Sequence, residues 1–181
     1  CICKVTIRFM SASRSLLAPA PPNFSSAEFR AALGMFATGV TIVTARTATG
    51  HLIGLTANSF NSVSLSPPLV LWSLARSAGS LSAFRSGSHY AINILGADQQ
   101  ALALQFAGPS SDRFAGVAFT LGDSGAPVLE GAAAHFECFN RSRYEEGDHV
   151  ILVGEVERCA HRSGTSPLLF HGGKFYAEHP L

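Results

Sequence analysis

Short runs rich in β-branched and aromatic residues, separated by glycine and proline, recur after residue 40 and constrain the fold most strongly. Residues 40–44 read VTIVT, and residues 69–74 read LVLWSL. Residues 51–56, 89–95 and 168–176 have a similar character. Such runs favour strands, whereas Gly and Pro mark the turns between them. The chain is therefore expected to be built mainly from short strands.

Two longer strands are expected near the C-terminus, at residues 133–144 and 149–159, paired as a hairpin across residues 145–148. The helices are expected to be few and short, at residues 25–37, 81–85 and 98–106. Many short strands with Gly-rich turns and few helices predict a mostly β fold, a closed or split β-barrel of Greek-key type.

The domain is expected to begin at residue 25. Ser25 and Glu28 have the spacing of a capping box, and Phe29, Leu33 and Phe36 follow at helical spacing. Residues 1–24 end in a Pro-rich stretch, which predicts an extended leader, disordered or loosely packed. The length of 181 residues suits one domain, so residues 25–181 are interpreted as a single unit.

The four cysteines do not predict a disulfide framework. Counting outward from the expected turn at 145–148 places Cys138 opposite Glu155 and Cys159 opposite Ala134. The two thiols are then not cross-strand partners, and both are expected to be reduced. Reduced thiols favour the cytoplasm.

Composition excludes several classes of partner. Hydrophobic residues make up 47% and charged residues 14%, enough apolar surface for a core and for self-association. The net charge of +1, without a Lys/Arg cluster, predicts no nucleic-acid binding. No run of 18 apolar residues is present to predict a membrane span. Arg14 interrupts the apolar positions after Lys4 and Arg8, so a secretory signal is not expected.

The segment 56–68 is the most unusual stretch of the chain, because it combines five hydroxyl side chains with two amides. Hydroxyls and free backbone N–H groups in a turn bind phosphate and the polar edge of a flavin without lysine. The G-x-G-x-x-G and Walker motifs are absent from the sequence, so any nucleotide cofactor would have to be held in some other way, such as this one. A serine-rich solvated loop is the alternative interpretation.

The sequence Gly147-Asp148-His149 gives a second candidate site at the hairpin turn. A histidine can donate, accept or carry charge near neutral pH. The alternative is an ordinary turn with a surface histidine.

A metal site is not expected. The His and Cys spacings do not form the paired units of zinc sites, and strand alternation sends His135 and Cys138 to opposite faces. The residues considered are His135, Cys138, His149, Cys159 and His161.

An ordered set of segments resembles the flavin reductase family, whose fold is the FMN-binding split barrel. The segments are residues 36–44, 54–64, 67–68, 89–95, 136–138, 147–149 and 168–175. Any one of them is weakly specific, but the ordered set from Phe29 to Tyr176 is strong.

The resemblance implies an NAD(P)H:flavin oxidoreductase, with FMN or FAD as flavin and NADH or NADPH as reductant. It implies a homodimer that passes reduced flavin to a partner monooxygenase. His149 is expected beside the nicotinamide as the catalytic residue. The expected cofactor-binding residues are Thr56, Ala57, Asn58, Ser59, Ser62, Val63 and Ser64 around the flavin ring and ribityl chain, with Arg76 and Ser80 near the phosphate.

Two rival functions stay open at this point. One is an oxidase resembling pyridoxamine-phosphate oxidase, which would want basic residues for the substrate phosphate. The other is a non-catalytic flavin-binding protein or sensor. Consumption of NAD(P)H with added flavin separates a reductase from the sensor, and oxidation of pyridoxamine phosphate tests the oxidase.

Overall fold

A computed structural model of the chain describes residues 20–110 and 112–178. The leader predicted at residues 1–24 therefore lies outside the described residues except for its last five positions. The helical segments are α1 (Ser26–Gly34), α2 (Leu81–Ser86), η1 (Ala97–Gln99) and α3 (Gln100–Ala107). The strands are β1 (Thr38–Gly39), β2 (Thr41–Arg46), β3 (Leu52–Ala57), β4 (Asn61–Leu65), β5 (Pro68–Ala75), β6 (His89–Ile94), β7 (Phe119–Leu121), β8 (Pro127–Leu129), β9 (Ala134–Glu146), β10 (His149–His161), β11 (Leu168–His171) and β12 (Lys174–Ala177).

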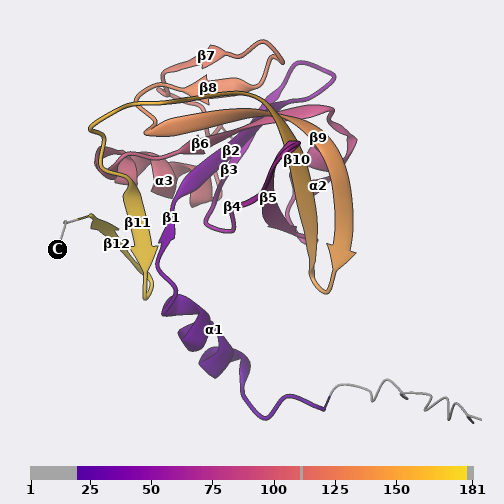
Figure 1. Ribbon diagram of the computed structural model, residues 1–181, viewed down its shortest axis with the longest axis vertical. Coiled ribbons are helices and arrows are strands. Elements are labelled where there is room, and N and C mark those ends of the chain that lie inside the picture. Colours follow the sequence, from indigo (N-terminus) through magenta and orange to yellow (C-terminus); the bar gives the residue numbers. More distant parts are fainter. Residues whose placement is uncertain (1–19, 111, 179–181) are drawn as a thin grey trace, which may run out of the picture.

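Seven strands form one curled antiparallel sheet in the order β3-β2-β6-β9-β10-β5-β4 (Figure 1). Its two edge strands, β3 and β4, are consecutive in the sequence and joined by residues 58–60. Four peptide steps span at most about 14 Å, so the two edges must approach each other at this corner. This geometry is the split barrel that the sequence predicts.

Two buried clusters hold the fold together. The first lies inside the curled sheet and is centred on Trp72, Phe84 and Tyr90. The second lies between the sheet, α3 and the β11–β12 hairpin, with Ile42 and Phe106 fully buried. Along β5, every second residue from Val70 to Leu74 is buried, as the period of a strand requires.

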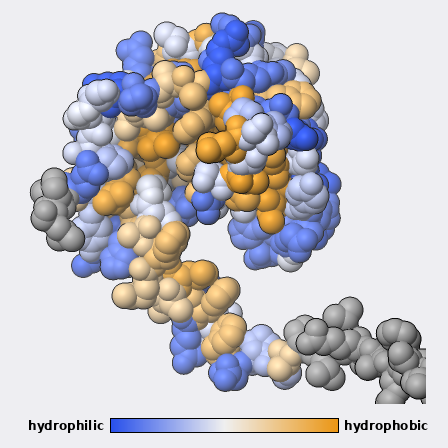
Figure 2. Space-filling model, in the orientation of Figure 1, coloured by the Kyte–Doolittle hydropathy of each residue, from blue (hydrophilic) through white to orange (hydrophobic). Residues whose placement is uncertain are grey.

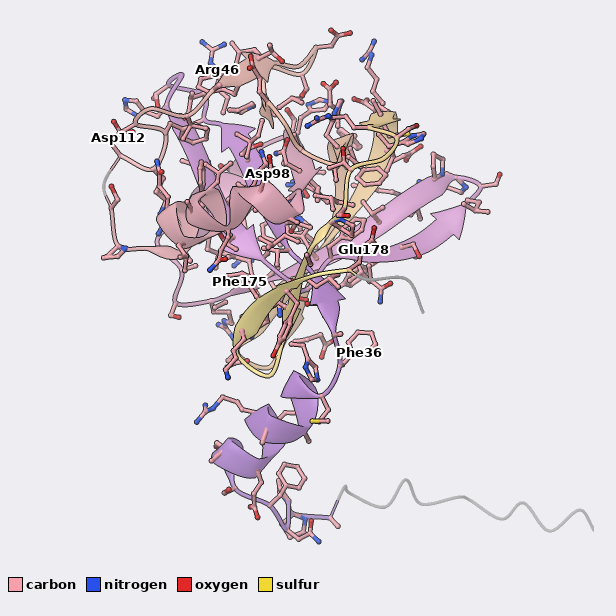
Figure 3. All side chains as sticks on the ribbon, turned by 90° about the vertical axis from the view of Figure 1, so that its left-hand side faces the viewer. Phe36, Arg46, Asp98, Asp112, Phe175 and Glu178 are labelled. Atoms are coloured by element: carbon pink, nitrogen blue, oxygen red, sulfur yellow. The ribbon has the colours of Figure 1, made fainter. Side chains whose placement is uncertain are left out.

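Helix α1 confirms the predicted capping box. The Ser25 backbone N–H donates to the Glu28 carboxylate at 2.7 Å, and the Glu28 N–H donates to the Ser25 hydroxyl at 3.2 Å. The helix ends at Gly34, earlier than the predicted residue 37, because Thr38 and Gly39 pair with β11. None of its residues is buried, and Figures 2 and 3 show the helix standing away from the barrel.

The strands differ from the prediction in three places. The segment 56–68 contains the strand β4, which the sequence hides because its edge position leaves it polar and largely exposed. Residues 168–176 form two strands, since Gly172 and Gly173 turn the chain back at φ of +55° and +81°. The β7–β8 hairpin was not expected, because three-residue strands are too short to show a period.

The β9–β10 hairpin is confirmed, but its register differs from the prediction. His149 pairs with Glu146, so the turn has two residues instead of four. With two bulges along the pair, Cys138 lies opposite Val156 and Cys159 opposite Phe136. The two thiols are free, as predicted, and burial raises the pKa of the Cys138 thiol to about 12. Cys138 is therefore a neutral core residue.

Candidate flavin site

A cavity of about 610 Å³ opens between β3, the C-terminal end of α3 and the turn that precedes α2. Hydroxyls of Thr56, Ser80 and Ser110 contribute to its lining. Apolar side chains form much of the rest, namely Leu52, Ile53, Leu55, Phe106 and Phe114. An apolar cleft of this size with a few polar groups is typical of sites for cofactors and other small molecules.

Close packing of α3 against β3 fixes one wall of the cavity. A Cβ atom at Gly54 would lie 2.6 Å from Phe106 Cε1, so only glycine allows this approach. The Thr56 hydroxyl donates to the Ala103 carbonyl at 2.6 Å. The Arg113 guanidinium donates from Nη1 to the Gly54 carbonyl at 2.9 Å. Hydrogen bonds along β3 therefore tie both α3 and the segment after it to the sheet.

The structure brings together two of the predicted cofactor-binding residues, Thr56 and Ser80, on the lining of this cavity. Ser80 is the first residue before α2, and its hydroxyl makes no capping hydrogen bond. That hydroxyl is available to a ligand. Thr56 lines the cavity as well, but its hydroxyl already donates to the Ala103 carbonyl.

Ser59 has a structural contact that sequence reasoning missed. Its hydroxyl accepts the Ser73 N–H at 2.9 Å and donates to the Ser73 carbonyl at 3.1 Å. These two bonds fasten the β3–β4 connection to β5 across the open corner of the barrel. The Ser59 side chain is therefore committed to the fold, whereas its backbone stays in the segment predicted to hold flavin.

The remaining residues predicted around the flavin lie outside the cavity lining. Ala57 ends β3, Asn58 is exposed in the connection, and Ser62, Val63 and Ser64 follow on the edge strand β4. The pairing of β4 with β5 shifts between Ser62 and Ser64, and Val63 is 50% exposed there. These residues form an accessible edge that continues from the end of β3.

His149 lies at the start of β10, where it pairs with Ala75 of β5. Its Nδ1 is 2.7 Å from the Asp148 carboxylate, and this hydrogen bond lowers the pKa of Asp148. The contact fixes the ring through Nδ1, so Nε2 is the nitrogen left for a ligand. The Arg76 N–H donates to the Asp148 carbonyl at 2.8 Å, which holds the hairpin turn beside the end of β5.

The segment from Arg76 to Ser80 links the two parts of the candidate site. It begins against the Asp148–His149 turn and ends in the cavity lining with Ser80. Arg76 itself is exposed and is not part of that lining. The predicted nicotinamide and flavin residues are therefore joined by one short connection.

Sequence reasoning missed the segment after α3, which contributes Ser110, Asp112, Arg113 and Phe114 to the cavity. Arg113 contacts Gly54, 59 residues earlier in the chain. Residue spacing does not indicate the contact between Arg113 and Gly54. The only local signal is the charged pair Asp112-Arg113 before Phe114.

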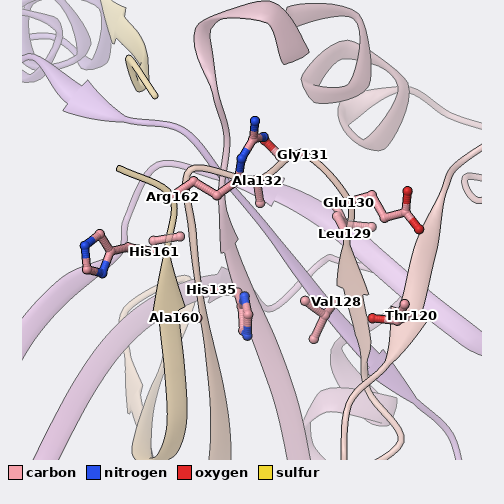
Figure 4. A pocket seen from close by; sticks show the side chains of 11 residues that line it. Thr120, Val128, Leu129, Glu130, Gly131, Ala132, His135, Ala160, His161 and Arg162 are labelled. Carbon is pink, nitrogen blue, oxygen red and sulfur yellow. The ribbon is translucent and has the colours of Figure 1, made fainter. Parts of the chain in front are cut away.

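A second cavity, of about 230 Å³, lies where β8, β9 and β10 meet, and contains none of the predicted site residues (Figure 4). His135 faces it, while His161 turns away from His135. Residues 20–110 and 112–178 contain no group of three or more His, Cys, Asp or Glu side chains that could hold a metal ion. In the same part of the chain, helices of the length and apolarity that a membrane span requires are absent.

Comparison with known proteins agrees with this geometry. The flavin reductase like domain matches residues 33–179. The FMN reductase (NADH) SmoA of Agrobacterium fabrum is 49% identical over 86% of this chain and 87% of its own length. The reductase component of the flavin-dependent trigonelline monooxygenase of Acinetobacter baylyi is 40% identical over 82% of this chain. This chain spans only 48% of that relative.

A solved structure leads to the same family. The NADH:FAD oxidoreductase SgcE6 of Streptomyces globisporus C-1027, in complex with NAD and FAD fragments, superimposes with a TM-score of 0.81. It is 41% identical, with 85% of this chain and 93% of that chain covered. The domain match, the relatives and the split barrel agree: this chain belongs to the flavin reductase-like family.

Proposed function

We propose that the protein is an NAD(P)H:flavin oxidoreductase that binds FMN or FAD. The main support is the cavity beside β3, which residues 76–80 link to Asp148 and His149. The chain also belongs to the flavin reductase-like family. The cavity volume falls in the range of cofactor sites, and three of its lining residues, Thr56, Ser80 and Ser110, carry hydroxyls, which suit a flavin. The relative SmoA is an FMN reductase and the structural neighbour SgcE6 is an FAD oxidoreductase, and both use NADH according to their names. This supports NADH as the reductant.

The bound flavin and nicotinamide supply the chemistry, which is transfer of hydride from nicotinamide C4 to flavin N5. The chain has to hold the two rings in contact and in one orientation. Ser80 makes no capping hydrogen bond and would donate to the flavin, whereas Thr56 donates its proton to the Ala103 carbonyl and would offer only its oxygen as an acceptor. His149 Nε2 would engage the nicotinamide nucleotide.

The proposal includes a separate monooxygenase that receives the reduced flavin. The Acinetobacter relative is the reductase component of such a system, and it supports this part. The cytoplasm is the proposed location, because the exposed Cys159 thiol is free and suits a reducing compartment. Residues 25–181 are proposed to form the flavin reductase-like domain, with 1–24 as a leader before it.

We expect a homodimer. Helix α1 has nine residues, too few for a stable isolated helix, and it exposes Phe29 and Leu33 by 50% and 57% (Figure 2). Phe36, which follows the helix, is 75% exposed. A second copy of the chain would cover these side chains. Sedimentation velocity at micromolar concentration with flavin should give the mass of two chains, and Leu33→Ser with Phe36→Ser should shift it toward one. A monomeric wild-type protein would contradict the expectation.

The assignment of β4 to the flavin site gives a second expectation. Ser62→Ala should weaken flavin binding by about 1 kcal/mol, the net worth of one hydrogen bond. Ser59→Ala should in addition lower thermal stability, because it leaves the Ser73 N–H and carbonyl without their partner. Titration of flavin fluorescence measures the first effect and thermal unfolding the second. Unchanged flavin affinity in both variants would remove β4 and its connection from the site.

A further inference from the structure

An ion pair fastens helix α2 to the β9–β10 hairpin beside the candidate site. The Arg85 guanidinium, in the last turn of α2, donates from Nη2 to the Glu145 carboxylate at 2.6 Å. Glu145 lies near the end of β9 and pairs with Val150 of β10, and the turn before His149 follows it closely. The ion pair therefore joins segments that are 60 residues apart in the sequence, α2 and the end of the hairpin that carries His149.

Helix α2 has six residues and depends on such contacts, because a helix of that length is unstable alone. Its buried anchor is Phe84, which packs edge-on against Trp72 at 5.0 Å between ring centroids. The buried Asn140 amide donates to the Phe84 and Gly87 carbonyls at 2.6 and 2.9 Å. Arg143 Nη2 donates to the Gly87 carbonyl at 3.1 Å. Side chains of β9 therefore hold the C-terminal end of α2.

The opposite end of α2 lies at the flavin cavity. Residues 78–80, which directly precede the helix, contribute to the cavity lining. The Arg76 N–H, two residues earlier, donates to the Asp148 carbonyl at 2.8 Å, so the same segment also contacts the turn before His149. This segment, α2 and the end of the hairpin thus form one frame, which holds His149 relative to the cavity wall.

The ion pair is suited to orienting this frame more than to stabilising the fold. Its two side chains are 47% and 48% exposed, and an exposed ion pair contributes little to the free energy of folding. Hydride transfer, by contrast, requires two rings in one orientation, and a misplacement of about 1 Å can cost roughly a hundredfold in rate. A contact that adds little stability can therefore have a large effect on the reaction.

We propose that Arg85 and Glu145 are positioning residues, which set the His149 turn against the wall of the flavin cavity and so orient the nicotinamide toward the flavin. The proposal rests on the proposed flavin reductase function. Neither residue lines the cavity, so both act through α2 and β9. The ion pair between Arg141 and Glu155, with an N–O distance of 2.7 Å, is similarly exposed but joins β9 to β10 within the hairpin. It provides a matched control.

Anaerobic stopped-flow reduction at saturating nicotinamide nucleotide measures the effect. Arg85→Gln and Glu145→Gln should each lower the rate constant of flavin reduction about five- to tenfold, with flavin affinity and melting temperature close to wild type. The double variant should lose no more than either single variant, because both remove the same contact. Arg85→Lys should keep part of the rate, since the charge remains. Arg141→Gln and Glu155→Gln should reduce flavin at the wild-type rate.

Amide hydrogen exchange gives a readout that does not depend on activity. Because the Arg76 N–H donates to the Asp148 carbonyl, this amide should exchange faster in Arg85→Gln than in wild type and at the wild-type rate in Arg141→Gln. Unchanged exchange or an unchanged reduction rate in Arg85→Gln overturns the proposal. So does a loss in the double variant equal to the product of the two single losses.

A purely structural role has a different signature. If Arg85→Gln lowers flavin affinity and melting temperature along with the rate, the pair serves the fold and the proposal is overturned. The same holds if Arg141→Gln slows reduction as much as Arg85→Gln does. A wild-type protein that oxidises neither NADH nor NADPH with either flavin, although the exchange of Arg76 responds as expected, would instead overturn the proposed function.

Discussion

Replacing His149 with alanine should lower kcat/KM for the nicotinamide nucleotide about tenfold or more, while leaving flavin affinity close to wild type. A tenfold loss corresponds to about 1.4 kcal/mol of transition-state stabilisation. The reason is that the ring is fixed by the Asp148 carboxylate through Nδ1 and presents Nε2 at the end of β10. Because the protein supplies mainly orientation, losing this contact should affect the rate of hydride transfer more than the fold.

Anaerobic stopped-flow reduction isolates this step from flavin release. His51→Ala is a matched control, because His51 is an exposed histidine that borders a strand of the same sheet and lies outside the candidate site. The variant His149→Ala should unfold at the same temperature as wild type, since a partly exposed side chain at the start of β10 contributes little to stability. Wild-type rates in His149→Ala would make this residue an ordinary member of a hairpin turn.

Replacing Phe106 with alanine should lower the free energy of unfolding by about 3–5 kcal/mol, the usual cost of removing a buried phenyl ring. Phe106 is fully buried in the second core cluster and packs edge-on against Phe114 at 5.0 Å between ring centroids. It also fills the space above Gly54 that keeps α3 against β3. Because the ring lines the cavity, the same variant should weaken flavin binding.

Urea unfolding with an unchanged m-value measures the stability change. Leu104→Ala on the same helix is the control: Leu104 is 54% exposed, so its truncation should change stability by less than about 0.5 kcal/mol. A Phe106→Ala variant as stable as Leu104→Ala would mean that α3 does not pack on β3 as described.

The sequence predicts the strands that bury one face or both. Alternation and β-branched runs identify β2, β5, β6 and the β9–β10 hairpin, because burial imposes those residue choices. The capping box locates the start of α1 because its hydrogen bonds join residues only three positions apart. The candidate site was reached through an ordered resemblance, since hydroxyls in a loop and a histidine in a turn have ordinary explanations when each is taken alone.

The rest depends on contacts that local patterns do not encode. Strand β4 is a polar edge, so it carries no hydrophobic period. The register of β9 against β10 was missed because it depends on the length of the turn and on two bulges. Arg113 reaches the cavity only because α3 folds back on β3, and Ser59 meets Ser73 only when the two edges of the sheet approach.

Steady-state oxidation of NADH and NADPH, each with added FMN and FAD under one set of conditions, tests directly whether the protein is a flavin reductase. We expect at least one pairing to show rapid nicotinamide oxidation with reduction of the flavin, and NADH to serve better than NADPH. Binding of flavin without nicotinamide oxidation in all four pairings would contradict it and identify a flavin-binding protein instead.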